Sequence, residues 1–243
     1  MVITHILLDT PTLKACSTTC RSWYIATLPH LHHTLTLRRR AFDPARQGLI
    51  PLQKLRKMGL LQLVKRLRIQ EYDRPTILSD RSLVYFSAFT NVRELLIEEL
   101  DLRVFTSRMK LCFGHLAPTL RSLTLRTPRG AHYQLLYFLG LFPNLDDFRL
   151  IRDRTGEATA DPGLVPQSTP PLRGQLTLTW FDGEDFLRGL FKLSGGLRFR
   201  SMDLHEAEGA RFLLGACAKT LETLRVYPVW GTSKWYSERS SLI

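Results

Sequence analysis

A pattern of apolar residues recurs along most of this chain, and it constrains the fold more than any other feature. The pattern is L-x-x-L-x-L, with any large apolar residue allowed at the three L positions. Its middle residue falls at positions 67, 95, 123, 148, 176, 202 and 224, so consecutive copies lie 22 to 28 residues apart. A repeat of this length predicts an array of similar structural units.

Each copy alternates apolar and polar residues, which is the period of a β-strand. Segments with helical period lie between the copies, at 78–89, 104–116, 131–142, 184–193 and 209–218. Strands and helices that alternate in this way predict an α/β fold, a leucine-rich-repeat solenoid. The Asn or Cys that often follows the pattern is missing, so we expect an irregular solenoid like that of RNase inhibitor.

The repeats are predicted to span 63–230, and one connection within them differs from the rest. Residues 152–174 contain four prolines and three glycines and have no helical period, which predicts a surface loop. A loop this long is either functional or disordered. Residues 231–243 follow the repeats as a tail, or as a cap over the last apolar edge.

Two cysteines and three histidines near the start raise the question of a zinc site. Nine residues separate Cys20 from His30, and His32 and His33 follow at once. A zinc site of two Cys and two His has about twelve residues at that point, and three to five between the histidines. Because the spacing does not match, we expect no metal and no other cofactor.

A helix accounts for the same cysteines without a metal. Thr-Pro at 10–11 suits the N-cap and the first helical position, and cysteine packs there as a small apolar residue. Steps of 3, 4 and 3 then predict one helical face that holds Leu13, Cys16, Cys20 and Trp23.

The stretch LKACSTTCRSWYIATLPHLHHTLTL at 13–37 resembles the second half of a fungal F-box, with C-R-S-W at 20–23 as its core. The usual Leu-Pro opening is missing, and MVITHILLD precedes the motif instead. The resemblance therefore implies an F-box-like helical module at 1–33 with an incomplete first helix, a short F-box remnant ahead of the solenoid. A basic connector at 34–62 would join it to the repeats.

The similarity extends into the repeats, since three further segments resemble those of F-box/leucine-rich-repeat proteins from mushroom-type fungi: 170–181, 185–204 and 210–228. Members of this family are substrate receptors of SCF-type ubiquitin ligases. Their F-box binds a Skp-type adaptor, their repeats bind a protein substrate, and other cullin-based subunits transfer ubiquitin. The resemblance assigns the F-box core or adaptor contact to Ile6, Leu7, Leu13, Cys16, Cys20 and Trp23.

Strand alternation predicts a second surface, on the concave face of the repeats. If residues 67 and 69 point inward, residues 66, 68 and 70 point outward. The outward residues mix both signs of charge and include few aromatics, unlike a nucleic-acid track, so we expect a protein ligand. Candidate substrate contacts are Arg66, Arg68, Glu94, Glu98, Arg126, Arg149, Asp203, Arg225 and Tyr227.

The formal charge of +12 is concentrated between residues 36 and 70, where ten basic residues face one acid. Such a stretch can bind nucleic acid, a membrane surface or an acidic protein, or can simply be solvated. Four scattered cysteines favour a reducing, intracellular setting, in cytoplasm or nucleus. No signal peptide is recognised in MVITHILLDTPT, and the uncharged run at 130–145 is too short to span a bilayer.

Three functions remain open at this point. The first is a substrate receptor of a ubiquitin ligase, and the second is a protein-interaction scaffold with a degenerate F-box and no ligase. The third is a nucleic-acid or membrane-surface binder that uses the basic stretch at 38–68. An enzyme is not expected, because neither a phosphate-binding Gly motif nor G-x-S-x-G occurs.

Overall fold

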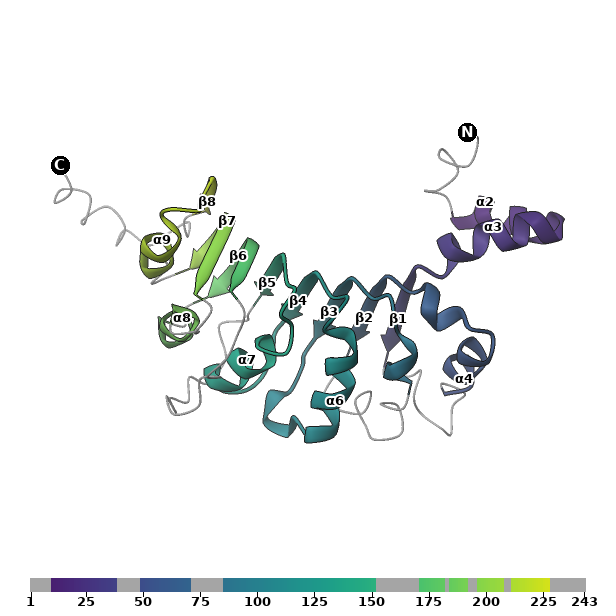
Figure 1. Cartoon of the computed structure of the whole chain (residues 1–243), viewed down its shortest axis with the longest axis horizontal. Coiled ribbons are helices and arrows are strands. Elements are labelled where there is room, and N and C mark those ends of the chain that lie inside the picture. Colours follow the sequence, from purple (N-terminus) through teal and green to yellow (C-terminus); the bar gives the residue numbers. More distant parts are fainter. Residues whose placement is uncertain are drawn as a thin grey trace.

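The computed structural model of the chain describes residues 10–38, 49–70, 85–151, 171–181, 184–191, 196–207 and 211–227. One sheet of eight strands forms its centre, and the strands lie in the order of the chain, from β1 to β8. Each neighbouring pair is parallel. Figure 1 shows an open, curved sheet with β1 and β8 at its two ends.

Most of the strands are five residues long, whereas β6 and β7 are about twice that length. Their bounds are β1 Thr34–Arg38, β2 Arg66–Gln70, β3 Glu94–Glu98, β4 Ser122–Arg126, β5 Asp147–Ile151, β6 Leu172–Phe181, β7 Leu197–Ala207 and β8 Thr223–Tyr227.

Helices lie before the sheet and between its strands. The pair α2 (Thr10–Thr19) and α3 (Arg21–Leu31) precedes β1. Between strands lie α4 (Leu49–Lys57), η3 (Leu60–Leu63), η4 (Phe86–Ala88), η5 (Leu102–Val104), α6 (Ser107–Leu116), α7 (His132–Leu139), α8 (Glu184–Phe191) and α9 (Arg211–Cys217), where η marks a short 3-10 helix. In Figure 1 the helices between the strands lie on the convex side of the sheet.

The apolar residues of the repeat form the core between the sheet and these helices. Leu67, Leu95 and Leu123 are direct partners across β2, β3 and β4, and all are buried. On the helix side, the rings of Phe113 and Phe138 meet edge to face with centroids 5.2 Å apart. All seven middle positions of the repeat lie on strands, so the strand positions predicted from the repeat are confirmed.

The class of the fold needs a correction. In place of a leucine-rich-repeat solenoid, the structure is an α/β fold with a single eight-stranded, all-parallel sheet and few helices. The described residues of the β2–β3 and β5–β6 connections contain no α-helix. All-parallel sheets are shared with Rossmann-like and TIM-like proteins, but here the strand order follows the chain and the sheet remains open.

Three local predictions also change. The connector predicted at 34–62 begins with β1, which pairs with β2 as part of the sheet. The helix predicted at 78–89 is, in its described part, the short η4. The loop predicted at 152–174 ends earlier, because β6 starts at Leu172.

Several predictions fall outside the described residues. These are the assignments of Ile6 and Leu7, most of the 152–174 loop, and the tail or cap at 231–243. Among the described helices, none has the length and apolar character needed to cross a membrane.

Gly174 lies at the start of β6, where the backbone of β6 comes close to the residue that precedes β5. Its φ is +81°, and a Cβ there would lie 1.8 Å from the backbone oxygen of Asp146. That same oxygen accepts a hydrogen bond from the amide of Gln175 at 2.8 Å. Gly174→Ala should therefore lower the free energy of unfolding by roughly 3 kcal/mol, through left-handed strain and overpacking, as measured by urea denaturation.

Gly114 provides the matched control. It lies in α6, and a Cβ there would meet nothing within 4 Å. Gly114→Ala should leave stability unchanged or raise it by up to about 1 kcal/mol. Equal effects of the two substitutions would contradict the role of Gly174 as the close contact between β5 and β6.

Candidate protein-binding surfaces

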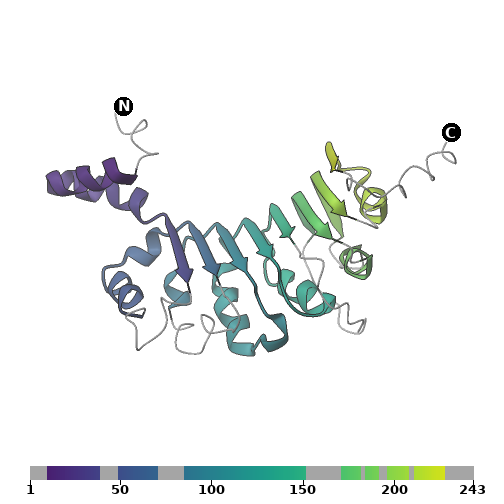
Figure 2. The ribbon, with the colours of Figure 1, turned by 180° about the vertical axis from the view of Figure 1, so that it is seen from behind.

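The first candidate surface is the helix pair α2–α3. Figures 1 and 2 both show this pair projecting beyond the β1 end of the sheet. Cys20 separates the two helices, because its backbone is extended with φ −157° and ψ 166°. The chain passes from α3 into the sheet at His33, whose backbone oxygen accepts from the amides of Lys65 and Arg66, each at 2.8 Å.

This break corrects the prediction of one continuous helical face. Leu13 and Cys16 lie on α2, whereas Trp23 lies on α3 and Cys20 at the junction. Leu13 is 4 % exposed, Cys16 is half-buried, Cys20 is exposed, and Trp23 is 36 % exposed. Leu13 therefore belongs to the contact between the helices, while Trp23 is available to a partner.

The helix pair has almost no core of its own. Of the 10 residues of α2, Leu13 is buried, and of the 11 residues of α3, Thr27 is buried. The Thr27 hydroxyl donates within α3, to the backbone oxygens of Trp23 at 2.9 Å and Tyr24 at 3.1 Å. Helices this short are marginal without tertiary packing, and among the described residues few side chains of the pair provide it.

Two further exposed residues extend the apolar surface of α3. Tyr24 is 39 % exposed and Ile25 is 57 % exposed. Neither residue belongs to the face predicted from the sequence, because one continuous helix through Cys20 places Leu13, Cys16, Cys20 and Trp23 on a face that excludes both. The WYI triplet next to the F-box-like core was the signal that could have identified them.

The second candidate surface is the face of the sheet that points away from the connecting helices. Outward residues of neighbouring strands lie side by side in register: Arg66 pairs with Glu94, and Glu98 with Arg126. In Figure 2 this face is the inner, concave side of the sheet. Parallel sheets are usually covered on both faces, so a face that none of the described helices covers is notable.

Ion pairs link β2, β3 and β4 across this face. The Arg66 Nε lies 2.9 Å from a carboxylate oxygen of Glu94. Glu98 accepts from Arg68 at 2.5 Å and from the Gln70 amide at 2.6 Å, and Arg126 lies 3.6 Å away. Glu98 is the most enclosed carboxylate of this set, because its side chain is 11 % exposed.

A similar arrangement continues along β4 to β8. Asp147 accepts from Ser122 at 3.0 Å and from Arg149 at 3.1 Å. Asp203 accepts from the Gln175 amide at 3.0 Å, with Arg225 at 4.0 Å. At the β8 end of the face, the rings of His205 and Tyr227 stack with centroids 4.0 Å apart.

The structure thus brings the nine predicted concave residues onto one face. Four further polar residues on this face had not been selected as contacts. Gln70, Ser122 and Gln175 each donate to a carboxylate of the face, and Asp147 is the carboxylate that accepts from Ser122. Strand alternation already placed them on the outward side, but side-chain pairing becomes visible only once neighbouring strands are in register.

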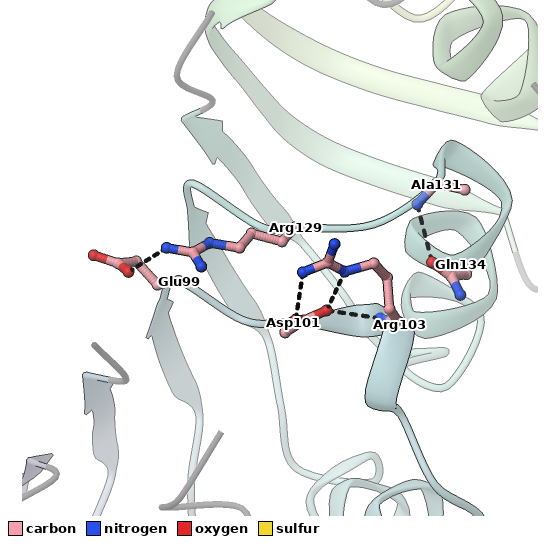
Figure 3. Close-up of polar contacts among 6 residues, drawn as sticks. All are labelled: Glu99, Asp101, Arg103, Arg129, Ala131 and Gln134. Carbon is pink, nitrogen blue, oxygen red and sulfur yellow. Dashed lines mark hydrogen bonds and ion pairs between the residues drawn. The ribbon is translucent and has the colours of Figure 1, made fainter. Parts of the chain in front are cut away.

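The loops at the carboxyl ends of β3 and β4 are where an open α/β sheet would place a small-molecule site. Figure 3 shows that their polar groups hold the loops together. Arg129 donates to Glu99 at 3.1 Å, and Arg103 binds both carboxylate oxygens of Asp101, at 3.0 and 2.8 Å. The guanidinium of Arg103 holds the pKa of Asp101 below its ordinary value. These contacts support the turns.

The basic stretch at 38–68 is divided among different environments. Arg66 and Arg68 pair with acids of β3. Lys54, Arg56 and Lys57 lie in the last turn of α4, where cations offset the helix dipole. The described part of the stretch therefore presents no continuous row of cations, and Arg39, Arg40 and Arg46 fall outside the described residues.

Comparison of the chain with protein-family models, with curated proteins and with solved structures found no match. Within the described residues, no group of three or more His, Cys, Asp or Glu side chains could hold a metal ion. The candidate surfaces therefore stand on their own geometry.

Glu98 and Glu94 form a matched pair for testing the ion-pair network. Glu98→Ala should lower the free energy of unfolding by about 2 kcal/mol, because it removes the enclosed acceptor that Arg68 and Gln70 share. Glu94→Ala should cost less than about 1 kcal/mol, because Glu94 and Arg66 are both about half exposed. Urea denaturation of both variants measures the difference. Similar costs would show that Glu98 has no special place in the network.

Asp101 should make stability depend on pH. Because Arg103 lowers its folded pKa, its contribution is present above the ordinary carboxyl pKa of about 4 and is lost as pH falls through the folded value. The stability difference between the unmodified protein and Asp101→Asn should therefore shrink between pH 6 and pH 3. In an Arg103→Gln background the shrinkage should be smaller. A pH-independent difference would refute the assignment.

Proposed function

We propose that this chain is the substrate-recognition subunit of an SCF-type ubiquitin ligase. In this role α2–α3 binds a Skp-type adaptor and the polar face of the sheet binds a protein substrate. One observation carries the proposal: α2–α3 buries Leu13 and Thr27 but leaves Trp23, Tyr24 and Ile25 exposed. The resemblance of the same segment to an F-box implies that a Skp-type adaptor would cover these residues.

The energetics of the helix pair support a docking role. Burying one large apolar side chain contributes about 1.5–3 kcal/mol, and aromatic residues dominate many protein interfaces. Trp23, Tyr24 and Ile25 can each supply such an anchor, and because successive helical residues point in different directions, a partner would cover them from more than one side of α3. A partner that covers them would also provide the packing that two short helices lack.

The sheet supports the second half of the proposal, because it is stable without using its polar face. Its apolar residues from β2 to β7 are buried in the core, whereas Leu224 and Val226 of β8 are exposed. The opposite face remains open to a ligand over β2 to β8. In this proposal other subunits of the ligase, including the cullin, transfer ubiquitin. The chain would then act in the cytoplasm or nucleus.

The nucleic-acid reading has less support. The described cations of the 38–68 stretch lie partly in ion pairs and partly in the last turn of α4. A nucleic-acid-binding surface instead has its cations clustered together with exposed aromatic rings. A protein scaffold without a ligase would use the same two surfaces and differs from the proposal only in the partner of α2–α3. Adaptor binding therefore decides between them.

The adaptor test uses Trp23→Ala in the full chain. If α2–α3 is the docking surface, purified Skp-type adaptor should bind the unmodified protein and bind Trp23→Ala at least about 30-fold more weakly, as expected of an interface hot spot. Isothermal titration calorimetry measures both affinities.

Leu111→Ala is the matched control, because Leu111 is 69 % exposed but lies on α6. It should bind the adaptor like the unmodified protein. Thermal unfolding of both variants verifies that the sheet is intact. An unmodified protein that does not bind the adaptor would favour the scaffold function, and tight binding by Trp23→Ala would place the docking surface elsewhere.

A further inference from the structure

Acids and bases on the polar sheet face lie at different depths. Three carboxylates are largely covered, with side-chain exposures of 11 % for Glu98, 22 % for Asp147 and 14 % for Asp203, whereas Glu94 is 48 % exposed beside Arg66. The arginine partners of the first two are exposed, at 48 % for Arg126 and 48 % for Arg149. Apart from the exposed pair of Arg66 and Glu94, the face therefore presents mainly guanidinium groups to the solvent.

These guanidinium groups keep donors for a ligand. A guanidinium has about five N–H donors. Arg149 contacts Asp147 through its Nε, at 3.1 and 3.3 Å, so these hydrogen bonds use none of the donors on its two terminal nitrogens. Arg126 lies 3.6 Å from Glu98, which is an ion-pair distance longer than a hydrogen bond. The covered carboxylates thus position the arginines without saturating them.

The strand register places the arginines in two neighbouring rows of the outward face. Arg68 on β2 and Arg149 on β5 share one row, and Arg126 lies two residues further along β4. Because neighbouring strands are about 4.8 Å apart and residues about 3.3 Å apart along a strand, Arg68 and Arg126 are separated by about 12 Å. An extended peptide advances about 3.3 Å per residue, so acids about three to four positions apart reach both. Leu96 of β3, the half-buried register partner of Arg68, provides an apolar floor beside it.

We infer that the polar sheet face binds an extended acidic peptide, a protein segment rich in Asp and Glu that crosses β2 to β5 and meets Arg68, Arg126 and Arg149. Guanidinium groups bind carboxylates in a bidentate way, which gives direction as well as affinity. The inference rests on the proposed function, because it names the class of protein segment that the receptor face would recognise.

A polyanion such as RNA is the main competing ligand for a cationic surface. Single-stranded nucleic acid binds along rings on which its bases stack. The described ring pair on this face, His205 and Tyr227, lies on β7 and β8 and the two rings stack on each other. The arginines of β2, β4 and β5 lie away from it, which favours a peptide.

The test measures binding of a fluorescein-labelled peptide with Glu at every third position to the full chain by fluorescence anisotropy, at low and physiological salt. We expect saturable binding, and at least tenfold weaker binding by the double variant Arg126→Gln/Arg149→Gln. Arg126→Lys/Arg149→Lys should fall between the two, because lysine keeps the charge but loses the bidentate geometry.

Arg121→Gln/Arg173→Gln is the matched control with the same change in charge. These arginines contact Asp146, ahead of the outward row of β5, and their removal should leave the affinity within about twofold of the unmodified protein. Equal losses in the two double variants would overturn the inference, since they would show a response to net charge alone. Binding that oligouridylate displaces as readily as unlabelled peptide, or no binding at low salt, would overturn it too.

Adaptor titration of the same preparations separates the two proposals. Adaptor binding without peptide binding refutes the acidic-peptide inference and leaves the proposed function standing. Peptide binding without adaptor binding supports the inference and refutes the ligase role. Thermal unfolding of each double variant verifies that lost binding does not come from lost structure.

Discussion

Leu95 and Ile97 lie beside Leu123 and Leu125 in adjacent parallel strands, and all four are fully buried. This contact recurs along the sheet, and the rest of the structure depends on it. A shift of one residue in the pairing would turn the apolar residues outward and the charged residues into the core. The repeat in the sequence prevents such a shift, because each copy presents the same two apolar positions to the helices.

The same register determines what the opposite face can do. Residues that flank the buried positions point outward on every strand, so charges from neighbouring strands must lie next to each other. The structure accommodates them by pairing the carboxylates with arginine or amide partners, which cover Glu98 through Arg68 and Gln70 but leave Glu94 half exposed. The arginines remain accessible. A packing constraint on one side of the sheet thereby produces an ordered cationic surface on the other.

The helix pair α2–α3 differs from the sheet in its source of stability. The sheet has an extended core, whereas α2–α3 buries Leu13 and Thr27 among its described residues. Trp23, Tyr24 and Ile25 of α3 are exposed. The proposed function assigns these residues to an adaptor and the open face of the sheet to a substrate.

The sequence by itself determined the positions of β2 to β8, the direction of their side chains and the outward residues from Arg66 to Tyr227, because alternation and repeat length are local properties of the chain. It did not determine that β1 joins the sheet, that Cys20 ends a helix, or that few helices accompany the strands. Those outcomes depend on contacts between distant segments. The tertiary structure alone decided which carboxylates are covered and which arginines stay exposed. The burial of a charged side chain depends on its neighbours, and these come from three adjacent strands.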